Sequence, residues 1–141
     1  MTDYLHPMMD DHALRQCSAL ALAHMGDSVY ELMVRGYLTS SGLVTSRNLH
    51  HETIRLVCAG AQAAAAHAIQ PLLTEDEDAV FRHGRNSRPK SIPKSSSPME
   101  YALATAVESL FGWLYLRGQY DRLNELFEAA LPAAQAWASR K

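Results

Sequence analysis

The chain has 141 residues, of which 48% are hydrophobic, and a formal net charge of −2 at pH 7. This length predicts one domain with one core, and the near-neutral charge excludes a general attraction to polyanions. No apolar run is long enough to span a bilayer, the acidic first residues do not resemble a secretion signal, and the two cysteines form no CxxC pair. We therefore expect a cytoplasmic protein without membrane association.

The first predicted long helix runs from about Leu14 to Thr39, after an N-terminal arm over residues 1–11. Within it, the stretch ALALAHMGDSVYELMVR is apolar around most of its circumference, which indicates a buried helix. Asp27 lies inside this stretch. An unpaired buried carboxylate costs on the order of several kcal/mol, so Asp27 requires an ion pair, a hydrogen-bonding network or a metal ion.

The next segments also predict helices. One starts after Thr45 or Ser46 and extends through Cys58, and Gly60 is a candidate kink. The alanine-rich stretch AQAAAAHAIQPLL continues as helix until Pro71 ends it, because alanine is a strong helix former.

A capping box of Thr74 and Glu77 begins the following helix, which should end near Gly84. The acidic run over residues 75–78 falls in the first turn, where acids stabilise the helix dipole. We interpret this run as a solvated helix start in preference to a metal cluster.

A basic segment follows. Residues 85–98, RNSRPKSIPKSSSP, contain three prolines and five serines, which predicts a mobile loop. Five cations and no acid occur between residues 82 and 94, namely Arg82, Arg85, Arg88, Lys90 and Lys94. Such cations usually form only a solvated face, but a flexible basic loop can also follow the phosphates of an RNA duplex, and we favour this second interpretation.

Two further helices complete the chain. The first extends from about Met99 to Leu116 and carries Glu108, which has no basic residue three or four positions away. The second extends from Asp121 to about Ala129 and can resume after Pro132. Because no segment shows strand-like alternation, the sequence predicts an all-α fold.

Asp27 and Glu108 each occur beside a glycine, Gly26 and Gly112, in an apolar helix. Glycines let two helices approach closely, so the carboxylates could meet across such a contact. Two like charges held together do not both stay ionised without a cation. Mg²⁺ bound by one or two carboxylates would meet this need, and so would a Lys or Arg from elsewhere in the fold.

Four segments carry a resemblance to a known family. Residues 20–35, LALAHMGDSVYELMVR, resemble the signature helix of the ribonuclease III catalytic domain, and residues 104–118, ATAVESLFGWLYLRG, resemble its second acidic helix. Residues 49–57, LHHETIRLV, are similar to the intervening helix. Residues 81–94, FRHGRNSRPKSIPK, are similar to the basic segment before the last acidic helix. The four segments occur in the family's order.

The chain is most similar to the short Mini-ribonuclease III branch of this family. Only ten residues follow Leu131, so we expect residues 1–141 to form a single catalytic domain without a double-stranded-RNA-binding domain. His83 to Asn86 resemble the RGRN segment of the branch. Ala23 and Thr105 stand where full-length ribonuclease III has two further acids, and the short branch shares this departure.

The resemblance implies the helical bundle of the ribonuclease III endonuclease domain and a homodimer that cleaves double-stranded RNA. It implies Mg²⁺, with Mn²⁺ as a substitute, held by Asp27 and Glu108 as the catalytic and metal-binding residues. The products would carry 5′-phosphate and 3′-hydroxyl ends, the substrate would be precursor 23S ribosomal RNA, and a ribosomal protein could assist. The RNA-binding residues would be Arg82, Arg85, Asn86, Arg88, Lys90 and Lys94.

Two other functions compete with this interpretation. A non-catalytic RNA-binding or ribosome-assembly module could keep the fold and lose cleavage, as Ala23 and Thr105 suggest, although Asp27 and Glu108 argue against it. An all-α phosphohydrolase acting on nucleotides would require a His-Asp pair or a tight Glu cluster, and the sequence has neither.

Overall fold

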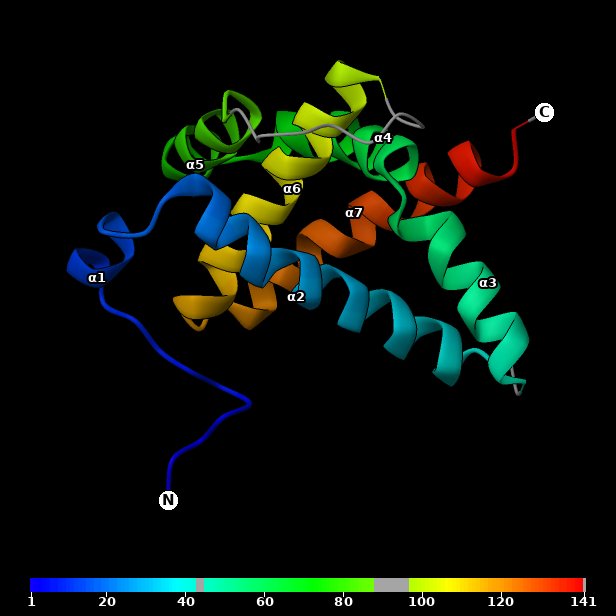
Figure 1. Ribbon diagram of the computed structural model, residues 1–141, viewed down its shortest axis with the longest axis horizontal. Coiled ribbons are helices and arrows are strands. Elements are labelled where there is room, and N and C mark those ends of the chain that lie inside the picture. The colour runs from blue at the N-terminus through cyan, green and yellow to red at the C-terminus, as the bar shows by residue number, and fades with distance from the viewer. Residues whose placement is uncertain (43–44, 88–96, 141) are drawn as a thin grey trace.

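The computed structural model describes residues 1–42, 45–87 and 97–140, and within them the chain is helical without a strand, which confirms the all-α prediction (Figure 1). The elements are α1 (Asp11–Arg15), α2 (Ala19–Ser40), α3 (Ser46–Val57), α4 (Ala59–Ile69), the short 3-10 helix η1 (Gln70–Leu72), α5 (Glu75–Arg85), α6 (Pro98–Leu116) and α7 (Tyr120–Ala138).

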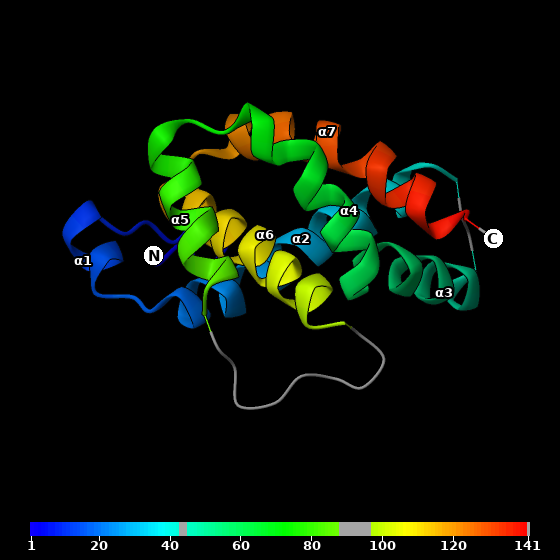
Figure 2. The same cartoon turned by 90° about the horizontal axis from the view of Figure 1, so that it is seen from above.

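Helix α6 is at the centre of the molecule. It packs against α2, α4, α5 and α7, and Figures 1 and 2 show it crossing α2 with the other helices arranged around it. Pro98 at its first turn and a capping box of Ser97 and Glu100 fix its start. The core that it forms with its neighbours includes Val107, Leu110, Phe111 and Leu114. The buried side chains of α6 are therefore positioned by several helices at once.

The predicted first helix, Leu14 to Thr39, is wrong at its beginning. The chain forms α1, leaves helical geometry, and starts α2 at Ala19. The Ser18 hydroxyl accepts a hydrogen bond from the Ala21 amide at 3.0 Å, so Ser18 caps α2 instead of continuing a longer helix.

The predicted kink at Gly60 is also wrong, because the break falls at Cys58, whose extended backbone (ψ 160°) separates α3 from α4. Gly60 has a different role. A Cβ at this position would overlap the indole ring of Trp137, so the glycine lets α7 pack directly on α4.

The capping box of Thr74 and Glu77 at the start of α5 is confirmed. Helix α7 differs from the prediction, because it runs through Pro132 without interruption to Ala138. Pro132 is exposed, so water can bind the helix carbonyl that the proline ring leaves without a donor. None of the helices in the described ranges is long and apolar enough to cross a membrane.

Candidate active site

The contact between α2 and α6 depends on two glycines. A Cβ on Gly26 would overlap the backbone carbonyl of Glu108, and a Cβ on Gly112 would overlap the carbonyl of Leu22. The two helix backbones therefore touch where they cross. The predicted close approach at Gly26 and Gly112 is present, and it determines which side chains meet at the crossing.

Asp27 and Glu108 lie next to each other at this crossing. Burial, the charge of Asp27 and a hydrogen bond with Asp27 raise the pKa of Glu108 to about 8. Without a cation, the pair therefore holds a proton at neutral pH. Two carboxylates from segments 81 positions apart in the sequence share one site.

Asp27 is nevertheless exposed, so the prediction that it is buried is wrong. The helix turns a different face to the core, and the buried residues of α2 are Ala19, Leu22, Ala23, Gly26, Val29, Tyr30, Val34 and Leu38. The exposed apolar residues Leu20 and Leu32 on the outer face gave the helix a sequence pattern typical of a buried one. Asp27 can therefore contact a ligand from solvent, while Glu108 is partly buried beside it.

Within the described ranges, no Lys, Arg or His forms an ion pair with either carboxylate. The nearest acid along α2, Glu31, is paired with Arg35 at 2.8 Å. The alternative of an internal Lys or Arg partner is therefore not supported by the part of the chain that the structure describes.

The donor set consists of two carboxylates. Ala23 and Thr105 are buried, and the Thr105 hydroxyl donates to the carbonyl of Tyr101 at 3.0 Å within α6. No cluster of three or more His, Cys, Asp or Glu side chains forms among the described residues. Two carboxylates fit Mg²⁺, which keeps several waters and completes its octahedron with substrate phosphate oxygens.

Sequence reasoning missed Gln62 of α4. Its side chain is only 2% exposed and lies near Glu108, whose pKa it lowers, although its Nε2 has no partner at hydrogen-bond distance and angle among the described residues. The available signal was an amide directly between alanines, at a position where an apolar residue would pack at least as well.

The described members of the predicted RNA-binding set lie at the end of α5. A Cβ on Gly84 would meet Ala106 and Ser109, so this end of α5 packs against α6 at residues within one turn of Glu108. Arg82 forms an ion pair with Asp78 at 2.9 Å. The other described members, Arg85 and Asn86, are the last residue of α5 and its C-cap.

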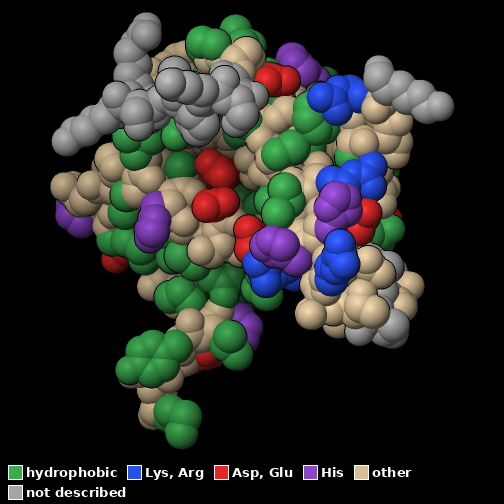
Figure 3. Space-filling view, turned by 45° about the vertical axis from the view of Figure 1, so that its right-hand side comes forward, with side chains coloured by type: hydrophobic (Ala, Val, Ile, Leu, Met, Phe, Trp, Pro, Cys, Tyr) green, Lys and Arg blue, Asp and Glu red, His purple; other side chains and the backbone are tan. Residues whose placement is uncertain are grey.

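Arg88, Lys90 and Lys94, the rest of that set, lie outside the described residues, as does most of the predicted loop 85–98. On the face shown in Figure 3, acidic side chains occur near the middle, and Arg and His side chains gather to one side of them. Acidic and basic groups therefore share one face of the molecule.

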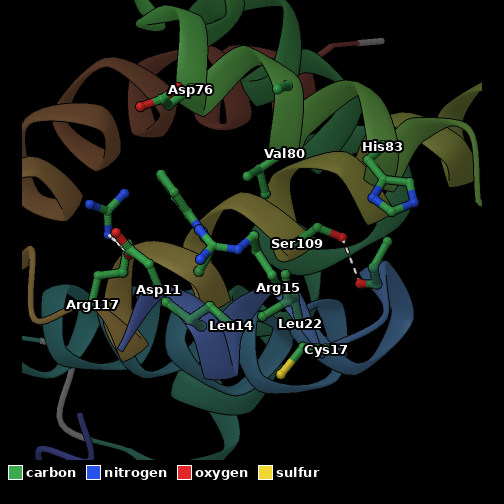
Figure 4. Close-up of a pocket in the computed structure, with 13 residues that line it drawn as sticks. Asp11, Leu14, Arg15, Cys17, Leu22, Asp76, Val80, His83, Ser109 and Arg117 are labelled. Atoms are coloured by element: carbon green, nitrogen blue, oxygen red, sulfur yellow. Dashed lines mark hydrogen bonds and ion pairs between the residues drawn. The ribbon is translucent and has the colours of Figure 1, made fainter. Parts of the chain in front are cut away.

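A separate cavity of about 480 Å³ lies between α1, the start of α2, α5 and α6 (Figure 4). Ser109, which donates to the carbonyl of Ala19 at 2.9 Å, is in its wall. Its acidic, basic and histidine lining residues are Asp11, Arg15, Asp76, His83 and Arg117. Neither Asp27 nor Glu108 lines this cavity, so it is distinct from the carboxylate pair.

The described part of the chain is helical, and two of its carboxylates meet at a helix crossing without an ion-pair partner there, an arrangement suited to divalent cations and phosphate-bearing substrates. Residues 20–119 match the Ribonuclease III domain family, and the chain belongs to this family. It is a ribonuclease III-type endoribonuclease, a hydrolase.

Individual relatives agree with this assignment. The chain is 48% identical to Mini-ribonuclease 3 of Symbiobacterium thermophilum over 111 residues, which cover 79% of this chain and 85% of that protein. It is 39% identical to Mini-ribonuclease 3 of Clostridium tetani, covering 84% and 79% of the two chains. The crystal structure of protein FN1578 from Fusobacterium nucleatum superposes with a TM-score of 0.75 at 30% identity and covers 81% of this chain and 93% of that one. The resemblance to ribonuclease III and its short branch is confirmed, and so is the fold.

Proposed function

We propose that this protein is an Mg²⁺-dependent endoribonuclease that hydrolyses double-stranded RNA at Asp27 and Glu108. The observation that carries the proposal is the meeting of these two carboxylates without a cation from the described part of the chain. A bound Mg²⁺, for which Mn²⁺ could substitute, would lower the pKa of a bound water and neutralise the phosphoryl oxygens.

The two carboxylates would act differently because their environments differ. Exposed Asp27 is accessible from solvent, so it would meet the ion first. Glu108 holds the shared proton, and its carboxyl group would release this proton to solvent as the ion binds. The site therefore stays partly neutral until a cation arrives.

The end of α5 would bind the RNA backbone. Arg82, Arg85 and Asn86 lie at the end of α5, which packs on α6 within one turn of Glu108, and cations there would neutralise phosphates near the cut. Arg88, Lys90 and Lys94 follow directly in sequence, and we propose that they extend this contact along the duplex.

We further propose precursor 23S ribosomal RNA as the substrate, with products that carry 5′-phosphate and 3′-hydroxyl ends. The support is the similarity to the short branch of the family, and action on this RNA would require the protein in the cytoplasm, where a ribosomal protein could assist.

We also propose that the protein works as a homodimer, because two strands require two centres. Exposed apolar side chains would be covered by a second copy, including Leu20 on α2, which is 42% exposed, and Tyr4 and Leu5 in the N-terminal segment. Sedimentation of the protein and of Leu20→Glu tests this, and a monomeric unmodified protein would contradict it.

The test of the main proposal compares three proteins on a structured RNA that contains paired 23S precursor ends. With Mg²⁺ present, the unmodified protein should cleave, and Asp27→Asn and Glu108→Gln should each lose about a hundredfold to a thousandfold in rate, on the scale of removing a group that stabilises transition-state charge. Cleavage that survives both substitutions would refute the site. Binding without cleavage by the unmodified protein would favour the non-catalytic alternative.

A further inference from the structure

We propose that Gln62 is a positioning residue of this site, whose side-chain amide donates a hydrogen bond to the ionised Glu108 carboxylate and holds it in the orientation that binds the cation. The inference rests on the proposed function, because it requires Glu108 to be a metal ligand.

The position of Gln62 leads to this role. Helix α4 packs against α6, and Gln62 lies on its buried side among alanines. Ala61, Ala63, Ala65 and Ala66 of the same helix are buried as well. The amide is thus enclosed in the core, near enough to Glu108 to lower the pKa of that carboxyl group.

The unpartnered nitrogen is the second observation. Gln62 Nε2 is buried and donates to no acceptor among the described residues. A buried polar group without a hydrogen bond costs about 1–3 kcal/mol, so an apolar residue at this position would stabilise the fold. The amide therefore needs an acceptor that exists in another state of the site.

The ionised Glu108 carboxylate is that acceptor. Two carboxylates that hold a cation only accept hydrogen bonds, so Asp27 cannot donate to Glu108 in the cation-bound site. Gln62 is the amide placed beside Glu108 to supply the missing donor, and carboxylates that bind metals are commonly oriented by such hydrogen bonds.

The test uses Gln62→Met, which keeps the length of the side chain and removes both N–H donors. Mn²⁺ binding to the intact protein is measured by isothermal titration calorimetry without RNA, beside the thermal unfolding midpoint. We expect about 10–100-fold weaker Mn²⁺ binding, the usual effect of removing such a partner. The midpoint should stay equal or rise, since a buried unpaired amide is removed. With RNA, kcat should fall at fixed Mg²⁺ while KM for RNA stays unchanged.

Ser109→Ala is the matched control. Ser109, which follows Glu108 on α6, is buried like Gln62, but its hydroxyl donates to the carbonyl of Ala19. This variant should lower the unfolding midpoint and leave Mn²⁺ affinity unchanged, which is the opposite pattern. Gln62→Asn, which keeps an amide but withdraws it by one methylene, gives a second measure of the Mn²⁺ affinity if the Met variant does not fold.

The outcomes separate the two proposals. Equal Mn²⁺ affinity in Gln62→Met, or in Gln62→Asn if that variant must be used, and in the unmodified protein overturns the role of Gln62 and leaves the proposed function intact. If the unmodified protein binds no Mn²⁺ and cleaves no RNA, both the role of Gln62 and the proposed function are refuted.

Discussion

Two glutamates of this molecule, Glu77 and Glu108, lie beside a neighbouring helix and face side chains of opposite charge. Glu77 of α5 is 4% exposed, and Arg122 of α7 donates to both of its carboxylate oxygens, at 2.8 and 2.9 Å. Burial raises the pKa of Glu77, but the hydrogen bonds from Arg122 and Thr74 and the charge of Arg122 outweigh it, so the net pKa is lowered. At the contact between α2 and α6, Glu108 faces Asp27, and its pKa is raised to about 8.

The opposite pKa shifts indicate that Glu77 is a structural acid and Glu108 a functional one. The charge of Glu77 is neutralised within the fold, and Arg122 also donates to the carbonyl of Leu72 at 2.8 Å, which ties α7 to the turn before α5. Glu108 has an acid as its neighbour, so its neutralising charge must come from a proton or from a bound cation.

The largest predicted change in stability is at Glu77. Glu77→Gln leaves Arg122 partly buried without its carboxylate, which should cost about 3–5 kcal/mol in the free energy of unfolding, measured by urea denaturation at pH 7. Because the folded pKa of Glu77 is lowered, its contribution is present above the unfolded pKa of about 4.5 and is lost as pH falls through the folded pKa. The gap between the two proteins should therefore close in acid.

The control for this prediction is Glu125→Gln. Glu125 also pairs with Arg122, at 3.4 Å, but its side chain is 66% exposed, so its loss should have almost no effect. Equal effects at Glu77 and Glu125 would contradict the view that Glu77 is the structural partner.

Glu108→Gln should act in the opposite direction on stability. In the metal-free protein the folded pKa of Glu108 is raised, so between about pH 4.5 and 8 the folded state holds a proton that the unfolded state has lost, and stability falls as pH rises. The neutral amide avoids this loss. Since one pKa unit corresponds to about 1.4 kcal/mol, Glu108→Gln should be more stable than the unmodified protein by a few kcal/mol at pH 8 and nearly equal at pH 5.

Unfolding midpoints measured at pH 5, 6, 7 and 8 in EDTA check this prediction. Addition of Mg²⁺ at pH 8 should stabilise the unmodified protein and leave Glu108→Gln nearly unchanged, because binding to the folded state alone shifts the unfolding equilibrium. A midpoint difference between the two proteins that does not vary with pH would contradict the shared proton.

Gly26→Ala tests whether the helix crossing creates the acid pair. The new methyl group would overlap the carbonyl of Glu108, so α2 and α6 must separate. Overpacking of this kind should cost about 1–3 kcal/mol, and it should weaken Mn²⁺ binding because the two carboxylates move apart. Gly36→Ala in the same helix is the control, since a Cβ there meets nothing within 4 Å, and it should stabilise the protein by about 0.5–1 kcal/mol. Unchanged Mn²⁺ binding in Gly26→Ala would show that the metal site does not depend on the close approach of α2 and α6.

The sequence predicted much of this arrangement because its signals are local. Gly26 beside Asp27 and Glu108 one turn before Gly112 indicated two helices in close contact with facing acids, and the family resemblance gave the fold that joins them. The capping box at Thr74 was predictable for the same reason, since both of its members lie within one turn.

Features that depend on distant contacts were not predictable in this way. The pairing of Glu77 with Arg122 joins residues 45 positions apart, and nothing in either neighbourhood specifies it. The exposure of Asp27 depends on which face of α2 packs on α6, and the outward-facing Leu20 and Leu32 obscured that face. The role of Gln62 depends on the packing of α4 against α6, which the sequence around Gln62 does not specify.

The smallest predicted effect extends the same comparison to the basic end of α5. Arg82 is already paired with Asp78, whereas Arg85 has no ion-pair partner among the described residues. An arginine that already forms an ion pair with a carboxylate attracts a phosphate less strongly than an arginine without such a partner. Arg85→Ala should therefore weaken duplex RNA binding several-fold and reduce the slope of log K against log salt by about 0.7–0.9, the change expected for one lost phosphate contact. Arg82→Ala should change the RNA affinity and the salt slope less than Arg85→Ala does. Filter binding at several KCl concentrations measures the affinity and the slope. Equal slopes in the Arg85 variant and the unmodified protein would show that Arg85 does not contact RNA, and this result would not affect the assignment of the carboxylate pair.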